Sequence, residues 1–354
     1  MVGISQHHDE QMDAIPATQL LNFLGEVYGE ADLEYLDPPK RILGGAEAEI
    51  FGFNVSTRTK ELSGSLVLRL FSEGRAVLQA RKETALQNAL AGLGYPVPRV
   101  VVHGNTEISG RPFTIMDRVP GETMLSGITF DESGISNASE RLATVHAALH
   151  RIPSKPVVKL VEKAGIPASA FSLSNWFRMV EGYFKDGWFD DLRPGFNWLN
   201  SNKPSERETL SVCHGDFHPG NIMIHQDEVS GVLDWPGAAF AEPEFDVAIT
   251  LVLMKIAGAE LFSGAGSVMR RFGDSYLSNY QQLNGLDLEK VRYYEAFRCF
   301  RAFTRGMASH TPGTHPDLVP HDAYAWASPQ RMKGIASRFT EITGIDLPLP
   351  KSLE

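Results

Sequence analysis

Apolar residues in the first third of the chain gather in short runs that predict β-strands. Residues 65–71 form an almost continuous apolar run that contains one cation, Arg69. Residues 49–55, 99–103 and 112–117 form comparable runs, and runs of this length are typical of buried strands. A charged side chain is costly to bury unless it meets an opposite charge. We therefore expect Arg69 to bind an anion.

Other segments repeat their apolar residues at helical spacing. Helices are predicted over residues 74–92, 139–151, 247–256 and 291–308. The second of these carries His146 and His150, one helical turn apart. Such a pair can bind a metal ion, but no glutamate accompanies it in the pattern of a metalloprotease helix. Histidines that serve in packing or at the surface are the favoured interpretation.

The composition is that of a soluble globular protein with more than one small core. The chain has 354 residues, of which 43% are hydrophobic and 21% charged. Its net charge of −10 argues against a nucleic-acid partner, because such partners are bound through cations on their phosphates. The N-terminus lacks a signal pattern, and the most apolar later run, 247–262, is broken by Lys255 and Glu260. We expect a cytoplasmic protein with no membrane partner.

The most informative segment, residues 214–221, has the sequence His-Gly-Asp-Phe-His-Pro-Gly-Asn. It contains Asp216 and Asn221, and a second carboxylate, Asp234, follows after a gap of hairpin length. Kinase catalytic loops use this spacing to place one base and two magnesium ligands around a phosphoryl group. In-line phosphoryl transfer needs positioning and cations between the phosphates. The pattern therefore predicts a phosphotransferase in which Asp216 orients the acceptor hydroxyl.

Two short strands are predicted to bring the metal ligands together. Residues 222–225 and 231–234 are largely apolar, and residues 226–228 are available for the turn between them. Such a hairpin places Asn221 near Asp234. Because magnesium prefers carboxylate and carbonyl oxygens, these two residues are the candidate Mg²⁺ ligands.

Two other interpretations of the same residues remain open. Gly, Pro and Asn are common in turns, so the segment could be a turn without chemistry. Alternatively, His214, Asp216 and His218 could bind zinc or a similar ion in a metal-dependent hydrolase. This second hypothesis gives Asn221 and Asp234 no role.

The chain resembles the aminoglycoside phosphotransferase family, including its choline-kinase-like and macrolide-kinase relatives. The resemblance lies in the segments HGDFHPGNIM and GVLDW and in Glu-Pro-Glu-Phe-Asp at 242–246. The chain has His-Gly-Asp where protein kinases have His-Arg-Asp, and Leu-Asp-Trp where they have Asp-Phe-Gly. The resemblance implies an α+β, bilobal, protein-kinase-like fold. Its N-terminal β-sheet lobe with one main helix would be residues 1–117, and its mostly helical C-terminal lobe residues 118–354. Mg²⁺ and ATP, or GTP, would bind between the lobes.

A kinase-like N-terminal lobe must supply a phosphate-covering loop, a basic residue on a strand and an acidic partner on the next helix. Gly44 and Gly45 stand where the loop is expected, because glycine lets backbone N–H groups approach phosphates. Arg69 is the candidate basic residue, and Glu83 is its candidate partner. Well-known family members have Lys at the position of Arg69, so the nucleotide geometry is expected to differ.

Three further roles follow from the expected fold. Backbone groups from Met116 to Arg118 are expected at the inter-lobe hinge, where they would contact adenine. His214 is expected to be a buried brace for the catalytic loop. Asp246, just before the predicted helix 247–256, is expected to accept that loop's backbone N–H groups, to cap the helix, or to do both.

The acceptor has to be recognised by the C-terminal lobe. Residues 175–200 are rich in aromatic side chains, and packing of a helical insert is favoured over a substrate wall. Within residues 291–308, Arg298, Arg301 and Arg305 share one helix face. If this face lines the acceptor site, the acceptor is anionic or neutral, for instance a hydroxy acid or its thioester, instead of a cationic aminoglycoside. Salt bridges to surface carboxylates are the competing explanation.

The sequence thus predicts a small-molecule kinase that transfers the γ-phosphate of ATP or GTP to a hydroxyl of a small acceptor. A metabolite such as a hydroxy acid and an antibiotic of the aminoglycoside or macrolide type are both candidates. The alternatives are a catalytically idle nucleotide-binding regulator and the metal-dependent hydrolase. Because the base and both metal ligands are retained, the idle regulator is disfavoured. The oligomeric state stays open.

Overall fold

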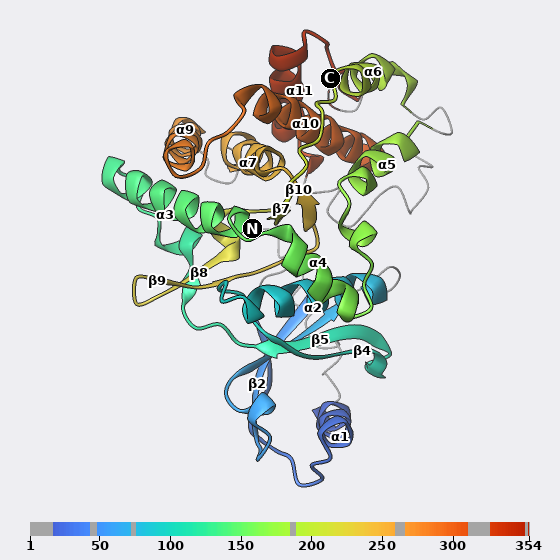
Figure 1. Ribbon diagram of the computed structural model, residues 1–354, viewed down its shortest axis with the longest axis vertical. Helices are drawn as coiled ribbons and strands as arrows, with labels where there is room; N and C mark the ends of the chain where they lie inside the picture. Colours follow the sequence, from blue (N-terminus) through green and yellow to red (C-terminus); the bar gives the residue numbers. More distant parts are fainter. Residues whose placement is uncertain are drawn as a thin grey trace, which may run out of the picture. The chain divides into compact units, whose positions relative to one another are not determined.

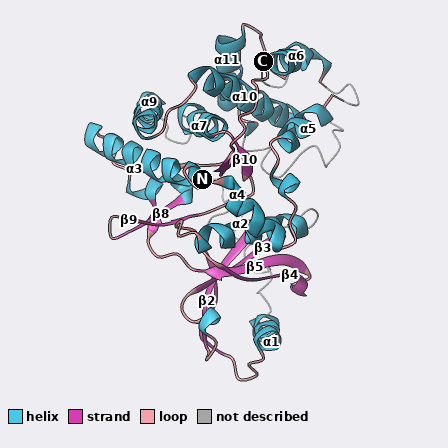
Figure 2. Cartoon of the chain, in the orientation of Figure 1, coloured by secondary structure: helices cyan, strands magenta, loops and turns pink. Residues whose placement is uncertain are grey.

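The computed structural model describes residues 17–42, 48–71, 76–184, 189–258, 266–310, 326–350 and 353. The chain divides into two compact units (Figure 1), whose helices and strands are distinguished in Figure 2. Unit 1 consists of Met1–Thr84 and Pro98–Arg118, and unit 2 consists of Ala85–Val97 and Val119–Glu354. None of the helices in the described ranges is long and apolar enough to span a membrane.

The division differs from a single cut after residue 117, because the segment Ala85–Val97 belongs to unit 2. This segment contains Leu86, Leu90 and Tyr95, which are buried in the main hydrophobic core of unit 2. The helix that carries the first two, α2 (Ala76–Gly92), therefore begins in one unit and ends in the other.

Unit 1 is built on an antiparallel sheet of five strands in the order β1-β2-β3-β5-β4. The strands are β1 Glu34–Ile42, β2 Ala48–Ser56, β3 Leu66–Phe71, β4 Val100–Ile108 and β5 Arg111–Asp117. The helix α1, Ala17–Tyr28, buries Leu20 and Leu24 in the same core as Leu66 and Leu68 of the central strand. A short 3-10 helix, η1 Lys60–Leu62, lies between β2 and β3.

The predicted strands 49–55, 65–71 and 112–117 are confirmed, with small shifts of their ends. The strand predicted at 99–103 is longer and runs to Ile108. Its extension has a physical reason at the turn, where Ser109 and Gly110 have φ angles of 55° and 65°. Two residues of positive φ match the twist of a tight hairpin, so β4 and β5 stay paired up to that turn.

Unit 2 is mostly helical. Its α-helices besides the end of α2 are α3 Glu132–His150, α4 Ser154–Lys163, α5 Ser174–Gly182, α6 Arg193–Ser201, α7 Pro243–Val252, α9 Gly266–Leu283, α10 Leu288–His310 and α11 Pro329–Thr343. Short 3-10 turns are η2 Met124–Gly127, η3 Ala168–Phe171, η4 Asp190–Leu192 and η5 Pro219–Asn221, and a π-helical turn, η6 Leu253–Ala257, follows α7. Helix α3 packs along α9, and α10 packs against both α7 and α11 (Figure 1).

Two small sheets in unit 2 position the candidate site. Strand β7, Ser211–Cys213, pairs with β10, Ala239–Ala241, and β6 (Glu122–Thr123), β8 (Ile222–His225) and β9 (Glu228–Val232) form a second sheet. The predicted hairpin is present, but its second strand begins at Glu228 and ends at Val232. Gln226 and Asp227 have φ angles of 51° and 63°, so a two-residue turn replaces the longer predicted one. Asp234 therefore lies beyond the strand.

Candidate active site

The loop that carries Asp216 leaves β7 through a tight turn at Gly215. This glycine has a φ of 80°, and a Cβ atom at its position would lie 2.2 Å from the carbonyl oxygen of Gly237. No larger residue fits so close to a neighbouring backbone, and left-handed backbone also favours glycine. The close approach of Gly215 and Gly237 fixes the direction in which the backbone continues to Asp216.

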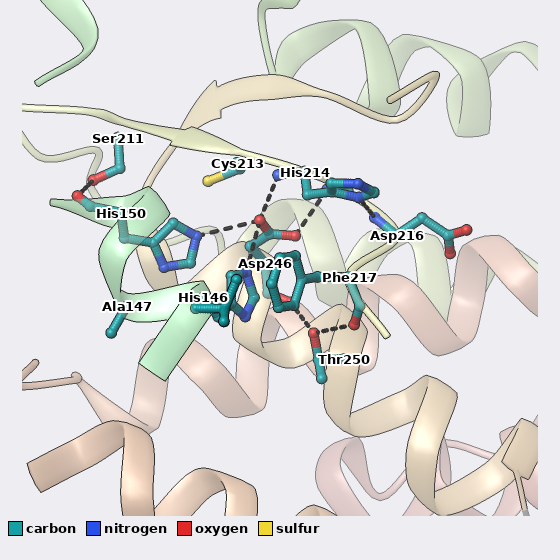
Figure 3. Close-up of polar contacts among 12 residues, drawn as sticks. His146, Ala147, His150, Ser211, Cys213, His214, Asp216, Phe217, Asp246 and Thr250 are labelled. Carbon is teal, nitrogen blue, oxygen red and sulfur yellow. Dashed lines mark hydrogen bonds and ion pairs between the residues drawn. The ribbon is translucent and has the colours of Figure 1, made fainter. Parts of the chain in front are cut away.

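The carboxylate of Asp246 binds the backbone of this loop (Figure 3). Its Oδ2 accepts the N–H of His214, and its Oδ1 accepts the N–H of Gly215 at 2.8 Å. Burial alone would raise the pKa of Asp246, but its contacts with His146 and His150 hold that pKa well below its usual range. An ionised, fully buried carboxylate therefore anchors the loop, in the contact that the sequence predicts.

The alternative role of Asp246 as a helix cap is wrong. Helix α7 begins at Pro243, and Glu242 occupies the N-cap position. Proline is common at the first position of a helix, because its fixed φ suits the helix. In addition, a backbone N–H at that position would have no partner within the helix, so its absence costs nothing. Asp246 consequently lies inside the first turns of α7, and its side chain is available for the loop.

Two histidines of α3 complete the surroundings of Asp246. The Nε2 atoms of His146 and His150 lie 3.0 and 3.2 Å from its Oδ2. Their Nδ1 atoms lie 2.7 Å from the hydroxyl of Tyr276 and 2.6 Å from that of Tyr280, both on α9. Burial lowers the pKa of His146 to about 3, so this ring is neutral at neutral pH. A neutral ring with its proton on Nε2 can donate to the carboxylate and accept from the tyrosine.

The same three residues, His146, His150 and Asp246, offer ligand atoms within 4.8 Å of one another, which a metal ion could share. The two Nδ1 atoms nevertheless bind tyrosine hydroxyls, and the Nε2 of His150 is hydrogen-bonded to Asp246, whereas the Nε2 of His146 lies 3.0 Å from that carboxylate without hydrogen-bond geometry. A metal ion would have to displace the tyrosine and carboxylate contacts of these rings. The geometry therefore favours the packing interpretation, with a contact to Asp246 that helical spacing alone did not indicate.

His214 connects Asp216 to the segment that carries Asp234. Its Nδ1 accepts the backbone N–H of Asp216 at 3.2 Å, and its Nε2 donates to the carbonyl of Leu233 at 2.9 Å. Burial lowers the pKa of His214, so the neutral ring that these two contacts require is favoured. This is the bracing role expected from the sequence.

These contacts do not support the metal-hydrolase hypothesis. Both ring nitrogens of His214 bind protein groups, and the Nδ1 of His218 accepts the N–H of Gly220 at 3.1 Å. The three proposed ligands, His214, Asp216 and His218, do not form a metal-binding cluster among the residues that the structure describes.

The two candidate magnesium ligands are held by the β8–β9 hairpin. The carbonyl of Asn221 accepts the N–H of Leu233 at 2.8 Å, and its side-chain Nδ2 donates to the carbonyl of Asp216 at 3.0 Å. This second bond orients the amide, so that its oxygen is the atom that could bind a cation. Asp234 has a φ of 66°, a conformation uncommon outside glycine and frequent at functional sites. One amide oxygen and one carboxylate are a donor set that fits Mg²⁺.

The side chain of Asp216 is 33% exposed, and its Oδ2 lies 3.6 Å from the Nε2 of His218. Burial raises the pKa of Asp216, but the contact with His218 and the positive charge of Arg298 lower it to about 2. Asp216 is therefore ionised at neutral pH. It can accept a hydrogen bond from a hydroxyl group, although it is a weak base.

Unit 1 contains the predicted ion pair. The Nη1 of Arg69, on β3, lies 3.1 Å from the Oε2 of Glu83, on α2, and the two side chains are 10% and 1% exposed. Gln79 donates to the other carboxylate oxygen at 3.0 Å. The guanidinium also lies 5.2 Å from the ring centre of Phe71. The carboxylate of Glu83 is therefore buried and does not lie on a solvated helix face.

The other nucleotide-binding candidates of unit 1 are only partly described. Met116 is buried within β5, and Arg118 follows that strand with an exposed side chain. The guanidinium of Arg118 passes over Gly52 of β2, where an added Cβ would lie 3.1 Å from its Nη1. No sequence pattern singled out Gly52. Gly44 and Gly45 lie outside the described residues.

The three candidate acceptor arginines lie on α10 as predicted. The exposed fractions of Arg298, Arg301 and Arg305 are 5%, 6% and 7%. The three side chains are therefore buried and do not form a row of exposed surface charges. The three guanidinium groups belong to the interior of unit 2.

The aromatic segment at 175–200 packs on the neighbouring helices. Phe177 stacks on Phe297 of α10 at 4.1 Å between ring centres, and Trp176 meets Phe245 of α7 edge to face at 5.1 Å. This arrangement agrees with the favoured packing interpretation.

Comparison with known proteins decides the family. The family model described as phosphotransferase enzyme family, APH, matches residues 41–294. The chain belongs to this family. The membership confirms the predicted resemblance.

Individual relatives are distant. Acyl-CoA dehydrogenase family member 11 from Homo sapiens is 26% identical over 204 residues, which cover 56% of this chain and 25% of that protein. The chain thus spans about a quarter of the length of those relatives. An aminoglycoside 3'-phosphotransferase from Streptomyces fradiae is 25% identical over 212 residues, or 57% of this chain and 72% of that protein.

A solved structure confirms the predicted fold class. Aminoglycoside phosphotransferase APH(4)-Ia, in a ternary complex with ADP and hygromycin B, matches with a TM-score of 0.58 and 17% identity. The match covers 90% of this APH-family chain and 98% of the other. The N-terminal antiparallel sheet and the mostly helical C-terminal part are therefore those of the phosphotransferase fold.

Proposed function

We propose that this protein is a small-molecule kinase that transfers the γ-phosphoryl group of ATP or GTP to a hydroxyl group of a small acceptor. The observation that carries the proposal is the hydrogen-bonded frame around Asp216, Asn221 and Asp234. Asn221 binds Asp216 through its side chain and Leu233 through its backbone, and His214 binds the same two residues. A carboxylate for the hydroxyl and two oxygen ligands for a cation are the parts that in-line phosphoryl transfer requires.

The transfer assigns one main task to Asp216. Its carboxylate accepts the hydrogen bond of the acceptor hydroxyl and directs the oxygen toward the γ-phosphorus. The acceptor oxygen forms a bond to that phosphorus while the bond to the bridging oxygen of the β-phosphate breaks, and the nucleoside diphosphate leaves. The hydroxyl proton passes to Asp216 and then to solvent. With a pKa of about 2, Asp216 contributes mainly orientation.

Asn221 and Asp234 are the residues that would hold Mg²⁺. The ion, when bound, supplies the positive charge that neutralises the phosphates during transfer. The residues of the chain set the position of this site: His214 and Asn221 both bind Leu233, next to Asp234. Asp246 also holds this loop, because its carboxylate accepts the backbone N–H groups of His214 and Gly215.

Unit 1 would supply the contacts to the nucleotide. Arg69, held by Glu83, is proposed to bind phosphate oxygens of the nucleotide. Backbone groups from Met116 to Arg118 are proposed to bind the base. The fold neighbours include complexes with ADP, AMP-PNP and GDP, which supports a nucleotide donor and leaves ATP and GTP as equal candidates.

The first experiment is thermal unfolding with and without Mg-ATP and Mg-GTP, followed by a phosphoryl-transfer screen over alcohols, hydroxy acids, amino-alcohols, aminoglycosides and macrolides. We expect a nucleotide-dependent rise in Tm and at least one phosphorylated product. Asp216→Asn should reduce kcat by about 10²-fold or more while the nucleotide-dependent rise is retained.

A matched control is Asp227→Asn, because Asp227 lies exposed in the β8–β9 turn and its left-handed backbone accepts Asn. This variant should keep wild-type activity. The absence of any Tm change with either nucleotide, or full activity in Asp216→Asn, would contradict the proposed function.

A further inference from the structure

The five-stranded sheet of unit 1 packs a hydrophobic core against one of its two faces. Leu66, Leu68 and Leu70 of the central strand β3 belong to this core. Successive residues of a strand point to opposite faces of the sheet, so Val67 and Arg69 point to the other face. Val67 is partly exposed there. We call this second face the open face of the sheet.

Gly52 of β2 also lies on the open face. It stands opposite Val67, which stands opposite Met116 of β5, and directly opposite residues of an antiparallel pair share a face. Ile42 of β1 reaches the same place, because its Cδ1 would lie 3.2 Å from a Cβ added to Gly52. Gly52 is thus the position without a side chain among apolar neighbours.

The guanidinium of Arg118 occupies the place that a side chain on Gly52 would take. Its Nη1 and Cζ would lie 3.1 and 3.6 Å from a Cβ added there, and the side chain of Arg118 is exposed. Even an alanine would be in tight contact with this group, and a larger residue would displace it. Gly52 therefore allows a charged group to rest against the sheet, on the same face as Arg69.

The charge of Arg118 is not taken up by a carboxylate. Among the residues that the structure describes, none lies within ion-pair distance of it. Its neighbour Asp117 is bound by Arg99 through two hydrogen bonds of 3.1 Å. A guanidinium that rests against the sheet with one side has its other side available to a ligand.

We propose that the guanidinium of Arg118 stacks on the base of the bound nucleotide. The inference rests on the proposed kinase function and names a side chain that determines the affinity for the nucleotide. Arg69 is the proposed contact of the phosphates, and it lies two residues from Val67 along β3, about 7 Å away. The base, at the opposite end of the nucleotide, then lies beside Gly52 and Arg118, where backbone groups of residues 116–118 are proposed to bind it.

Stacking on a base has a chemical signature that separates it from binding of a phosphate. Arginine is planar and stacks on aromatic rings through cation–π attraction. Adenine and guanine both present an aromatic face, so this contact strengthens the binding of ATP and GTP alike. An aromatic side chain can replace the guanidinium in this contact, because bases also stack on aromatic rings. It cannot replace a charge that binds phosphate.

The test measures the Kd of Mg-ATP and Mg-GTP by isothermal titration calorimetry. Arg118→Gln removes the planar cation and should raise both Kd values by about 3–30-fold. Arg118→Phe supplies a ring without a charge and should bind both nucleotides at least about threefold more tightly than Arg118→Gln. In the transfer assay, the KM for the nucleotide should rise in Arg118→Gln while kcat changes by less than about twofold.

Gly52 provides an independent variant. Gly52→Val displaces the guanidinium and should raise the Kd values as Arg118→Gln does, and the double variant should lose less affinity than the product of the two separate factors. Arg58→Gln is the matched control, because Arg58 is another cation of unit 1 and its side chain is 84% exposed. This control should leave both Kd values unchanged. If Gly52→Val fails to fold, the Arg118 variants decide the question alone.

The outcomes separate this inference from the proposed function. Unchanged Kd values in Arg118→Gln would overturn the stacking role and leave the kinase intact. Equal losses of affinity in Arg118→Gln and Arg118→Phe would overturn it in favour of a charge contact with the phosphates. Absence of both nucleotide binding and transfer in the wild-type protein would refute the kinase and the stacking role together.

Discussion

The Nε2 of His146 lies 3.0 Å from the Oδ2 of Asp246, and the same carboxylate accepts the backbone N–H groups of His214 and Gly215. A side chain of α3 is thereby coupled to the loop that carries Asp216 (Figure 3). The coupling continues outward, because His146 and His150 each bind a tyrosine of α9. The position of the loop that carries Asp216 therefore depends on contacts from α3 and α9 as well as on Asp246.

Replacing Asp246 should affect both stability and activity. Asp246→Asn removes the negative charge and replaces one carboxylate oxygen with an NH₂ group. That NH₂ group would face a backbone N–H of His214 or Gly215, which thereby loses its acceptor. We expect the free energy of unfolding to fall by about 2–4 kcal/mol and kcat to fall by about tenfold or more, with nucleotide binding retained. Urea unfolding and steady-state kinetics measure the two effects. Asp227→Asn, in the exposed β8–β9 turn, is the control, and equal unfolding curves for the two variants would disprove the anchoring role.

Stability should depend on pH through His146. Its pKa is lowered to about 3 in the folded protein from about 6.5 in the unfolded chain. The unfolded chain therefore binds a proton below about pH 6.5 that the folded protein does not, and stability falls as the pH falls. Between about pH 6.5 and pH 5 the loss from this group is about 2 kcal/mol.

The variant His146→Gln isolates that effect. Its amide can still donate to Asp246 but does not titrate, so the decrease in unfolding free energy between about pH 7.5 and pH 5 should be smaller by about 2 kcal/mol than in the wild-type protein. Urea unfolding at the two pH values measures the difference. A variant whose stability changes with pH as steeply as that of the wild-type protein would show that His146 is not the titrating group.

The buried pair of Arg69 and Glu83 should respond strongly to the loss of either charge. Glu83→Gln leaves a buried guanidinium without its carboxylate and should destabilise unit 1 by about 3 kcal/mol, and it should also raise the KM for the nucleotide. The matched control is Glu49→Gln, which breaks the more exposed pair of Glu49 and Arg111 and should cost less than about 1 kcal/mol. Similar losses of stability in the two variants would contradict the assigned burial.

Glycine should be indispensable at Gly215. A Cβ there would lie 2.2 Å from the carbonyl oxygen of Gly237, whereas Gly94 has a similar φ, 82°, with no atom near its Cβ position. Gly94→Ala measures the backbone strain alone, about 1 kcal/mol. Gly215→Ala should destabilise the protein by at least about 2 kcal/mol more, because the loop must also move, and it should lose most of its activity. Equal Tm values for the two alanine variants would contradict the steric explanation for Gly215.

The sequence by itself determined the residues whose chemistry depends on short spacing. The segment 214–221 with Asp234 could be recognised because one loop and one hairpin hold all its parts, so their separation along the chain fixes their separation in space. The burial cost of a cation in an apolar strand indicated that Arg69 needs an anion, and the family resemblance selected Glu83 among the acidic candidates, a pairing that the structure contains.

Only the tertiary structure decided what those residues meet from distant parts of the chain. The spacing of His146 and His150 indicated a shared helix face, but their contacts with Asp246, Tyr276 and Tyr280 join three helices. Likewise, the pattern of α10 placed its three arginines together without revealing that they are buried. Hydrophobic periodicity reports which side of an element faces inward, whereas the partner on that side is chosen by packing between elements far apart in sequence.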